Sequence, residues 1–281
     1  MDFTKLQGAG NDFVLIEGGP KFDYSRLARL ICDRHFGVGS DGLLVLLPSK
    51  IADFAMRMFN PDGSEAEACG NGLRCLVKYV YEKGLVKGAS KLTIETIKGV
   101  RRAELDKSGE KLAKIRVNMG VPRFTKEEIP LKLDREVEAP IFDYHFSVEG
   151  RVLSLNFVSM GNPHAVHFID EPVNNFPLSQ LGPLVERGEI FPQRVNFGVA
   201  RVLSRTEIEA RVWERGAGLT LACGSGACAI AVIAHLRNYV DQSVKVRLPG
   251  GVLEVDWDGV GEVFLSGPAE IVFAGKWLGE V

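Results

Sequence analysis

The stretch Glu-Arg-Gly-Ala-Gly-Leu-Thr-Leu-Ala-Cys-Gly-Ser-Gly-Ala-Cys-Ala, residues 214–229, decides the architecture that we predict for this chain. In it, Cys223 precedes a glycine-rich turn, and an apolar run follows. The first half of the chain contains a second copy, Ala-Cys-Gly-Asn-Gly-Leu-Arg-Cys, residues 68–75, in which Cys69 takes the same place. Because the two cysteines lie about half a chain length apart, the pattern predicts a duplicated structure with one motif in each half.

A helical pattern follows each motif. Residues 227–236 are apolar on nearly every side, so a helix there must be buried all round, most simply inside a curved sheet. In the first half, Gly84 can end an equivalent helix with one apolar face, formed by Leu73, Leu76, Val77 and Val80. A short third helix near the N-terminus has an apolar face of Leu27, Leu30 and Ile31.

Strand patterns outnumber the helical ones. Apolar and polar side chains alternate in three segments, as in strands with one solvent-exposed face: residues 114–117, 207–212 and 244–248. Further strand candidates are residues 13–16, 43–47, 54–59, 92–96, 152–158, 165–168, 252–257, 263–265 and 271–273. The sequence therefore predicts an α+β fold of two similar lobes, each a sheet around a central helix. Gly120 and Pro122 interrupt the pattern, which places a hinge near residues 118–123.

Composition restricts the class of protein. The 281 residues are 46% hydrophobic and 25% charged, as expected of a globular protein with a substantial core. The net charge of −2 gives no indication of a basic surface that would bind nucleic acid. The opening residues lack the features of a signal peptide, and no apolar run is long enough to span a membrane. We therefore expect a cytoplasmic protein that binds neither nucleic acid nor membrane.

Neither a metal nor a nucleotide cofactor is expected. The five cysteines are odd in number and contain no Cys-x-x-Cys pair, so reduced thiols are expected, with Cys32, Cys75 and Cys228 packed in the interior. Residues 37–42, Gly-Val-Gly-Ser-Asp-Gly, match the dinucleotide string G-x-G-x-x-G. A strand-like run follows where a helix is needed, so we interpret this string as a turn.

The two cysteine motifs can carry chemistry. A cysteine at a helix N-terminus lies near the positive end of the helix dipole and near free amides, which favour the thiolate and are expected to lower the thiol pKa. The same amides can bind a carboxylate, and the glycines allow a ligand close to the backbone. Alternatively, one copy is only a tight turn, although the duplication argues against this. Two opposed thiols suit the inversion of a carbon centre, one removing a proton and the other delivering one.

Other polar residues have open alternatives. Asn162 and His164 flank Pro163, and His164 is either a residue that tunes a nearby thiol or a packed histidine in a turn. Glu214 and Arg215 follow a strand and either hold an amine and a carboxylate or form a solvated pair. Three asparagines adjoin apolar strands as candidate binding or turn residues: Asn11, Asn60 and Asn196.

Taken together, these strings resemble the diaminopimelate epimerase family. The resemblance rests on five segments in the family's order, at residues 5–13, 59–75, 161–164, 195–197 and 213–229. It implies a PLP-independent isomerase that needs no cofactor and interconverts LL- and meso-2,6-diaminopimelate on the route to lysine. It further implies two pseudo-symmetric lobes, each a closed, mostly antiparallel sheet around a central helix, and often a homodimer. The lobes would comprise residues 1–118, joined by the last strand at about 266–281, and residues 119–265.

The resemblance also implies roles for individual residues. Cys223 would take the proton from the L centre and Cys69 would supply one on the other face, with these roles exchanged in reverse. Amides at Gly70, Asn71, Gly224 and Ser225 would hold the reacting carboxylate. Glu214 and His164 would modulate the thiol pKa values near the reacting amine. The substrate would be read by Asn11, Asn60, Asn162, Asn196, Glu214 and Arg215.

One departure and two rival functions accompany this interpretation. Some family members have a substrate-contacting glutamine where this chain has Gly42, so that contact must be lost or replaced. One rival is a proline or hydroxyproline racemase-like enzyme, whose ring substrate has no distal amine and carboxylate for Glu214, Arg215 and the asparagines. The other is a non-catalytic amino-acid-binding protein of the same fold, which would bind its ligand without exchanging the α-hydrogen.

Overall fold

The chain divides into two compact units. The computed structural model describes residues 1–19, 22–66, 69–86, 88–108, 111–133 and 137–279. One unit comprises Met1–Asn118 with Ser266–Val281, and the other comprises Met119–Leu265. The chain leaves the first unit within strand β8 (Lys111–Gly120) and returns within β17 (Val263–Gly267). Strand β8 continues through Gly120, so the first part of the hinge predicted near residues 118–123 has strand conformation.

Unit 1 contains one mixed sheet. Successive strands pair in the order β8–β7–β6–β4–β3–β2–β1–β18, with β5 paired to β4. The β2–β3 and β4–β6 pairs are parallel and the other pairs are antiparallel. The remaining strands of this unit are β1 (Asp2–Gly8), β2 (Asn11–Glu17), β3 (Gly42–Leu47), β4 (Phe54–Phe59), β5 (Glu65–Ala66), β6 (Lys91–Thr96), β7 (Gly99–Ser108) and β18 (Glu270–Lys276).

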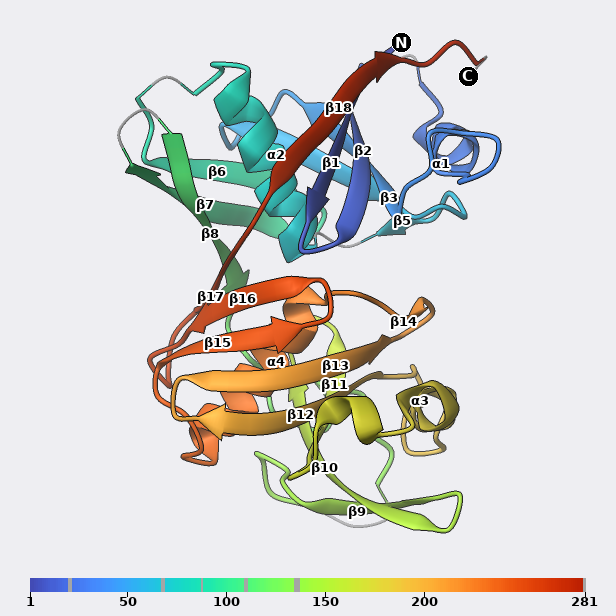
Figure 1. The fold of residues 1–281 in the computed structure, drawn as a ribbon, viewed down its shortest axis with the longest axis vertical. Coiled ribbons are helices and arrows are strands. Elements are labelled where there is room, and N and C mark those ends of the chain that lie inside the picture. Colours follow the sequence, from blue (N-terminus) through green and yellow to red (C-terminus); the bar gives the residue numbers. More distant parts are fainter. Residues whose placement is uncertain (20–21, 67–68, 87, 109–110, 134–136, 280–281) are drawn as a thin grey trace. The chain divides into compact units, whose positions relative to one another are not determined.

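Helix α2 (Gly70–Glu82) packs against β1, β2, β3, β4 and β18, so the sheet wraps around it (Figure 1). All four apolar residues predicted for its inner face are buried. Gly84, at a φ of 69°, ends the helix, and the Gly84 and Leu85 N–H groups donate to Tyr81 and Val80 carbonyls at 2.9 and 3.0 Å. This is a Schellman motif, which confirms the predicted end of the helix.

Helix α1 (Tyr24–Ile31) covers part of the same unit. Its N-terminus is capped by Asp23, whose side chain accepts a hydrogen bond from the Arg26 N–H. The buried face consists of Tyr24, Leu27, Ala28 and Ile31. Leu30 is 38% exposed, so its predicted place on the inner face is wrong. Tyr24 and Ala28, which are four residues apart, complete the buried face, and Leu30 lies outside it.

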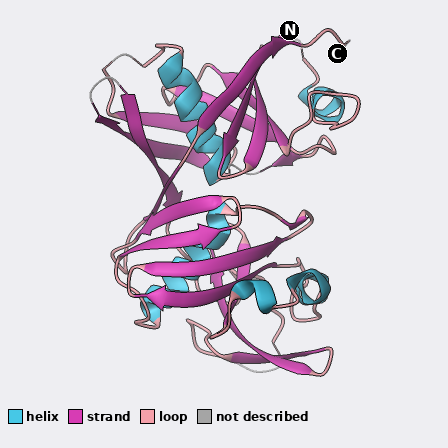
Figure 2. Ribbon diagram, in the orientation of Figure 1, coloured by secondary structure: helices cyan, strands magenta, loops and turns pink. Residues whose placement is uncertain are grey.

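Unit 2 repeats the pairing scheme of unit 1. Its strands pair in the order β9–β10–β11–β12–β13–β15–β16, with β14 paired to β13, and the β11–β12 and β13–β15 pairs are parallel. The strands are β9 (Tyr144–Val148), β10 (Arg151–Ser159), β11 (Pro163–Phe168), β12 (Asn196–Ser204), β13 (Glu207–Glu214), β14 (Gly218–Leu219), β15 (Ser243–Leu248) and β16 (Gly251–Asp256). Colouring by secondary structure shows that strands predominate over helices (Figure 2).

Helix α4 (Gly224–Leu236) is the centre of unit 2. It packs against β10, β11, β12, β13, β15 and β16, and every residue from Gly226 to Ala234 is buried. Asn238, at a φ of 55°, ends it with the same Schellman pattern: the Asn238 and Tyr239 N–H groups donate to His235 and Ala234 carbonyls, both at 2.8 Å. The prediction of an all-round apolar helix inside a curved sheet is confirmed.

The order of elements shows the duplication directly. Strands β1 to β7 of the first unit correspond in order and in pairing direction to β10 to β16 of the second, and α2 corresponds to α4. Helices α1 and α3 (Leu178–Glu186) occupy the same place between the second and third strands of each series. The predicted α+β fold with two pseudo-symmetric, strand-rich lobes is therefore confirmed.

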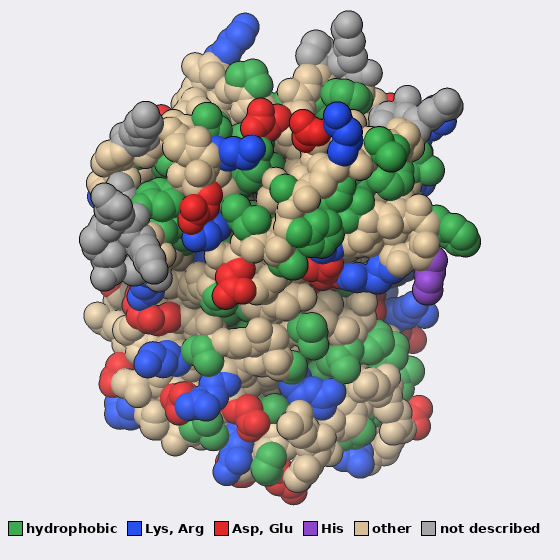
Figure 3. Space-filling model, turned by 45° about the horizontal axis from the view of Figure 1, so that its top comes forward, with side chains coloured by type: hydrophobic (Ala, Val, Ile, Leu, Met, Phe, Trp, Pro, Cys, Tyr) green, Lys and Arg blue, Asp and Glu red, His purple; other side chains and the backbone are tan. Residues whose placement is uncertain are grey.

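On the face drawn in Figure 3, acidic and basic side chains are interspersed, as the near-neutral net charge of −2 leads one to expect. No helix among the described residues is both long and apolar enough to cross a membrane.

Candidate active site

Cys69 is the N-cap residue of α2, as the motif predicts. Its backbone is extended, with φ −98° and ψ 138°, and its Sγ accepts a hydrogen bond from the Gly72 N–H at 3.4 Å. A Cβ on Gly72 would lie 3.1 Å from Leu44 Cδ2, so glycine lets the first turn pack closely on β3. Ala68, the first residue of the motif, lies outside the described residues.

Cys223 occupies the equivalent position at the start of α4. Its φ of −116° and ψ of 111° are again extended, and its Sγ accepts from the Gly226 N–H at 3.3 Å. A Cβ on Gly226 would lie 3.0 Å from Val212 Cγ2 and 3.2 Å from Cys223 Sγ. In both motifs a side chain on the second glycine would crowd a neighbouring strand, at Leu44 of β3 or at Val212 of β13, and the N–H of that glycine donates to the cysteine sulfur. Gly70 and Gly224 are the first helical residues, so their N–H groups have no acceptor within the helix.

The surroundings of Cys69 are formed by side-chain amides. Cys69 Sγ lies 3.8 Å from Asn11 Oδ1, within hydrogen-bond distance for sulfur. Asn71 Nδ2 donates to the same Asn11 oxygen at 3.2 Å, and Asn71 Oδ1 accepts from the buried Arg74 guanidinium at 2.7 Å. Asn11 and Asn71, both predicted site residues, therefore lie together at the Cys69 turn.

Cys223 has a different environment. Its Sγ lies 3.6 Å from Ser225 Oγ, and Ser225 Oγ accepts from Asn162 Nδ2 at 3.2 Å. Burial and, secondly, the nearby Glu214 carboxylate raise the pKa of the Cys223 thiol well above its ordinary value. The predicted lowering of this pKa is wrong, because desolvation outweighs the Gly226 N–H.

His164 belongs to the same cluster. Its Nε2 lies 3.0 Å from Asn162 Oδ1, whose amide nitrogen already donates to Ser225, so His164 Nε2 is the donor. Burial and, secondly, the Arg215 charge lower the pKa of His164 to about 3. The ring is therefore neutral near neutral pH. It contacts Asn162 rather than a thiol, and any effect on Cys223 passes through Asn162 and Ser225.

The other predicted residues divide into two groups. Asn196 is buried and ties strand ends together: its Nδ2 donates to the Pro163 carbonyl at 2.8 Å and its Oδ1 accepts from the Arg215 N–H at 2.9 Å. Glu214 accepts from Thr220 Oγ1 at 2.6 Å and lies beside Cys223. Asn60, in contrast, lies in a turn and donates to Ser64 Oγ at 3.0 Å. Of the two alternatives left open for Asn60, a turn residue accounts for this contact.

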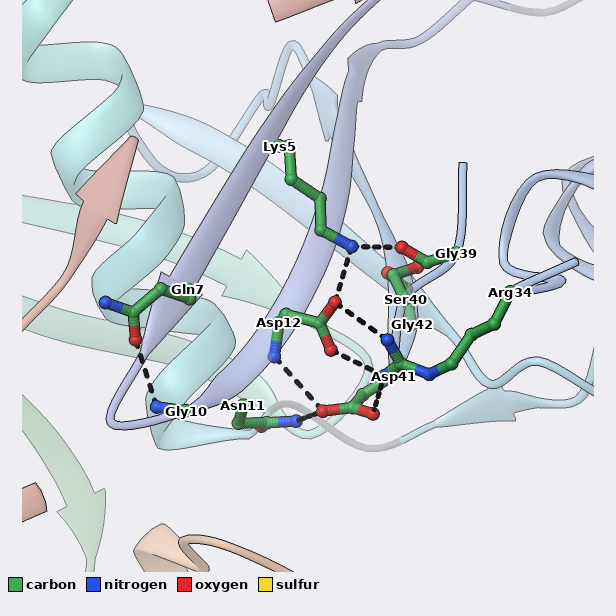
Figure 4. Close-up of polar contacts among 10 residues, drawn as sticks. All are labelled: Lys5, Gln7, Gly10, Asn11, Asp12, Arg34, Gly39, Ser40, Asp41 and Gly42. Carbon is green, nitrogen blue, oxygen red and sulfur yellow. Dashed lines mark hydrogen bonds and ion pairs between the residues drawn. The ribbon is translucent and has the colours of Figure 1, made fainter. Parts of the chain in front are cut away.

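Sequence reasoning missed a charged cluster behind Asn11. Asp41 Oδ2 accepts from Asn11 Nδ2 at 2.8 Å, and Asp41 Oδ1 accepts from Arg34 at 2.6 Å (Figure 4). Arg34 also binds Asp12, which pairs with the nearly buried Lys5. The turn interpretation of residues 37–42 is confirmed, but that turn also brings Asp41 to Asn11. The contact depends on the parallel pairing of β2 with β3, and no local sequence pattern signals it.

Gly42 and the three cysteines outside the motif positions are buried. A Cβ at Gly42 would lie 3.0 Å from the Phe59 carbonyl oxygen, so this start of β3 leaves little room for a side chain. Cys32, Cys75 and Cys228 are buried, as predicted. Within the described residues, no group of three or more His, Cys, Asp or Glu side chains is arranged to hold a metal ion.

Comparison with known proteins agrees with this geometry. The model of the diaminopimelate epimerase family matches residues 3–125 and 156–272. A diaminopimelate epimerase of Caldanaerobacter subterraneus is 46% identical over 98% of this chain and 99% of its own, and one of Methanococcus maripaludis is 42% identical over the same shares. Among solved structures, a probable proline racemase from Agrobacterium radiobacter has a TM-score of 0.74 at 18% identity, covering 98% of this chain and 92% of its own, and shows the shared fold. The chain belongs to the diaminopimelate epimerase family.

Proposed function

We propose that this chain interconverts LL- and meso-2,6-diaminopimelate with two cysteines as acid and base. The observation that carries the proposal is the matched pair of cysteine N-caps, each with its sulfur 3.3–3.4 Å from the third helical N–H. Two such thiols fit an inversion, in which the proton leaves one face of the α-carbon and another arrives on the opposite face. Membership of the family supports the substrate.

Cys223 is the proposed base toward the L centre. Its proton must leave before it can act, and the neighbouring Glu214 carboxylate is an acceptor for it. The resulting thiolate is stabilised by the Gly226 N–H and the Ser225 hydroxyl, both of which favour the charged form. Cys69, beside the carbonyl oxygen of Asn11, is the proposed acid. In the reverse direction Cys69 removes the proton and Cys223 supplies one.

The helix starts are the proposed site of the reacting carboxylate. Removing an α-proton transfers negative charge toward that carboxylate, so fixed N–H donors stabilise the transition state more than the ground state. The donors proposed for this task are the backbone amides of Gly70, Asn71, Gly224 and Ser225. Side chains of Asn11, Asn60, Asn162, Asn196, Glu214 and Arg215 are the proposed substrate-binding groups, and His164 acts by orienting Asn162. The chemistry asks for no cofactor.

The biological setting is part of the same proposal. A diaminopimelate epimerase supplies the meso isomer on the route to lysine, in the cytoplasm, and we propose that this chain does so as a homodimer. Sedimentation of the purified protein tests the last point, and a monomer at working concentration would contradict it.

The decisive experiment follows the α-hydrogen. Purified protein is incubated in heavy water with LL-diaminopimelate and, separately, with L-proline, and both deuterium content and configuration are measured. We expect deuterium at the α-carbon of diaminopimelate together with formation of the meso isomer, and no change in proline. Exchange into proline alone would instead establish a proline racemase, and binding of diaminopimelate without exchange would establish a binding protein.

A further inference from the structure

The amides around Cys69 form a chain with charged groups at both ends. At one end Arg74, which can only donate, binds Asn71 Oδ1 at 2.7 Å. At the other end the Asp41 carboxylate, which can only accept, binds Asn11 Nδ2 at 2.8 Å. Between them Asn71 Nδ2 donates to Asn11 Oδ1 at 3.2 Å. An amide can be turned end for end, but these two terminal groups admit one orientation of each.

The orientation decides which atom of the Asn11 amide faces Cys69. Because Asn11 Nδ2 faces Asp41, its carbonyl oxygen is the atom 3.8 Å from Cys69 Sγ. A carbonyl oxygen accepts a hydrogen bond from a thiol and repels a thiolate. If Asn11 were reversed, its NH₂ group would face the sulfur and favour the thiolate instead. The amide orientation therefore biases the protonation state of Cys69.

Asp41 is itself held firmly. Arg34 binds both Asp41 and Asp12, at 2.6 and 2.7 Å, and the Asp12 backbone N–H donates to Asp41 Oδ2 at 3.1 Å (Figure 4). Lys5 contacts Asp12 and the Gly39 carbonyl from the other side. Asn11 follows directly on the β1–β2 hairpin, in which Ala9 and Gly10 have φ values of 55° and 81°. Both the amide and its acceptor are thus fixed by the backbone and by ion pairs.

We infer that Asp41 is a positioning residue, which acts through Asn11 to present a carbonyl oxygen to Cys69 and keep that thiol protonated in the ligand-free protein. This deepens the proposed function, because a protonated Cys69 is the form required to deliver a proton to the LL substrate. The residue touches no reacting atom. Its carboxylate sets the direction of an amide that does approach the sulfur.

Asp41→Asn tests the inference with almost no change in volume. The new amide offers only one oxygen, while Arg34, Asn11 Nδ2 and the Asp12 N–H all require acceptors. Asn11 then gains from reversing, and a donor faces Cys69. In iodoacetamide labelling of substrate-free protein at neutral pH, with peptide mass mapping, we expect Cys69 to react about 5-fold faster relative to Cys223, the factor equivalent to one neutral hydrogen bond.

Asp12→Asn is the matched control. It removes the same charge from the same cluster, and the Asp12 side chain does not touch the Asn11 amide. We expect no change in the Cys69 to Cys223 ratio, because the Asp41 acceptor remains. Cys32, buried beside the cluster with a pKa raised to about 11 by desolvation, reports any loosening of the fold. It should stay unlabelled in both variants.

The outcomes separate the two proposals. An unchanged ratio in Asp41→Asn, an equal rise in Asp12→Asn, or labelling of Cys32 in parallel with Cys69 would each overturn the positioning role. The labelling uses no substrate, so its result does not depend on the reaction. If wild-type protein left diaminopimelate unchanged while the variants gave the expected labelling pattern, the proposed function would be contradicted and the role of Asp41 would be supported.

Discussion

The two cysteine turns share a backbone and differ in the side chains around it. Cys69 and Cys223 are both N-caps in extended conformation, both accept from the third helical N–H, and both precede a helix that ends in a Schellman motif. Cys69 lies beside the side-chain amides of Asn11 and Asn71, whereas Cys223 lies beside the Glu214 carboxylate and the Ser225 hydroxyl. The shared turn supplies N–H donors, and the neighbours give each sulfur its own electrostatics.

The helices behind these turns also differ. α2 keeps a polar side, with Lys78 and Glu82 paired at 2.6 Å, while α4 is apolar on all sides and buried from Gly226 to Ala234. Cys223 accordingly is 3% exposed and Cys69 is only partly buried. A duplicated fold therefore does not imply two thiols of equal reactivity. Deeper burial is the largest cause of the raised pKa of the Cys223 thiol.

The largest expected effect comes from replacing the cysteines one at a time. Cys69→Ser and Cys223→Ser should each lower the inversion rate by about 10²–10⁴, the contribution of a positioned acid or base. Exchange should separate them: in heavy water, Cys69→Ser should still exchange the α-hydrogen of the LL substrate through Cys223. Cys223→Ser should instead exchange the D centre of the meso substrate through Cys69. Nuclear magnetic resonance of the recovered substrate measures both.

Cys75→Ser is the control for this pair, since Cys75 follows the first motif but is fully buried, with a pKa raised by desolvation to about 12. It should retain inversion. If both motif variants lost exchange at both centres equally, the assignment of one thiol to each face would be wrong.

A smaller effect is expected from Glu214→Gln, which makes the surroundings of Cys223 resemble those of Cys69. Glu214 raises the pKa of Cys223 through its charge and through a hydrogen bond. A thiol with a raised pKa becomes thiolate only as pH rises past that value, so losing Glu214 should move the alkylation midpoint of Cys223 to lower pH. Iodoacetamide labelling across pH, with Cys69 in the same digest as reference, measures the shift.

Thr220→Val is the matched variant for this experiment. It removes the 2.6 Å hydrogen bond to Glu214 Oε1 and leaves the carboxylate charge in place. The midpoint of Cys223 should therefore stay above its ordinary range. A midpoint that did not move in Glu214→Gln would show that desolvation alone sets this pKa.

The parts of the fold that could be predicted are those in which a local pattern coincides with burial. Residues 207–212 alternate in sequence and alternate in burial along β13, and the apolar run after Cys223 is the buried helix α4. Helix α3 was missed because Pro183 lies inside it and interrupts the pattern of Leu178, Leu181 and Val185. Strand β1 was missed because Lys5, though charged, is almost fully buried through its pairing with Asp12.

The site shows a similar division. Both cysteine turns followed from glycine spacing and helix geometry, which are local properties. The pKa direction of Cys223 did not, because burial and the nearness of Glu214 depend on tertiary packing. The link from Asp41 to Asn11 spans 30 residues and depends on the parallel β2–β3 register, which no local pattern encodes.

The smallest expected effect concerns the two helix ends, where the same motif is built with different residues. Gly84 and Asn238 have φ values of 69° and 55°, in the region where glycine carries no steric penalty and asparagine a modest one. Gly84→Asn should therefore lower the free energy of unfolding by about 0.5–1 kcal/mol.

Asn238→Gly should change the free energy of unfolding by less than about 0.5 kcal/mol. The steric strain relieved at the positive φ is offset by loss of the 3.4 Å contact from Arg205 to Asn238 Oδ1. Lys83→Asn, one residue earlier at a φ of −74°, places the same asparagine at the helix end without a positive φ, and it also loses the Lys83 contact with the Tyr79 ring at 5.5 Å. Urea unfolding of the three variants compares them, and an equal loss in Gly84→Asn and Lys83→Asn would mean that the positive φ of the Schellman position is not what the first helix depends on.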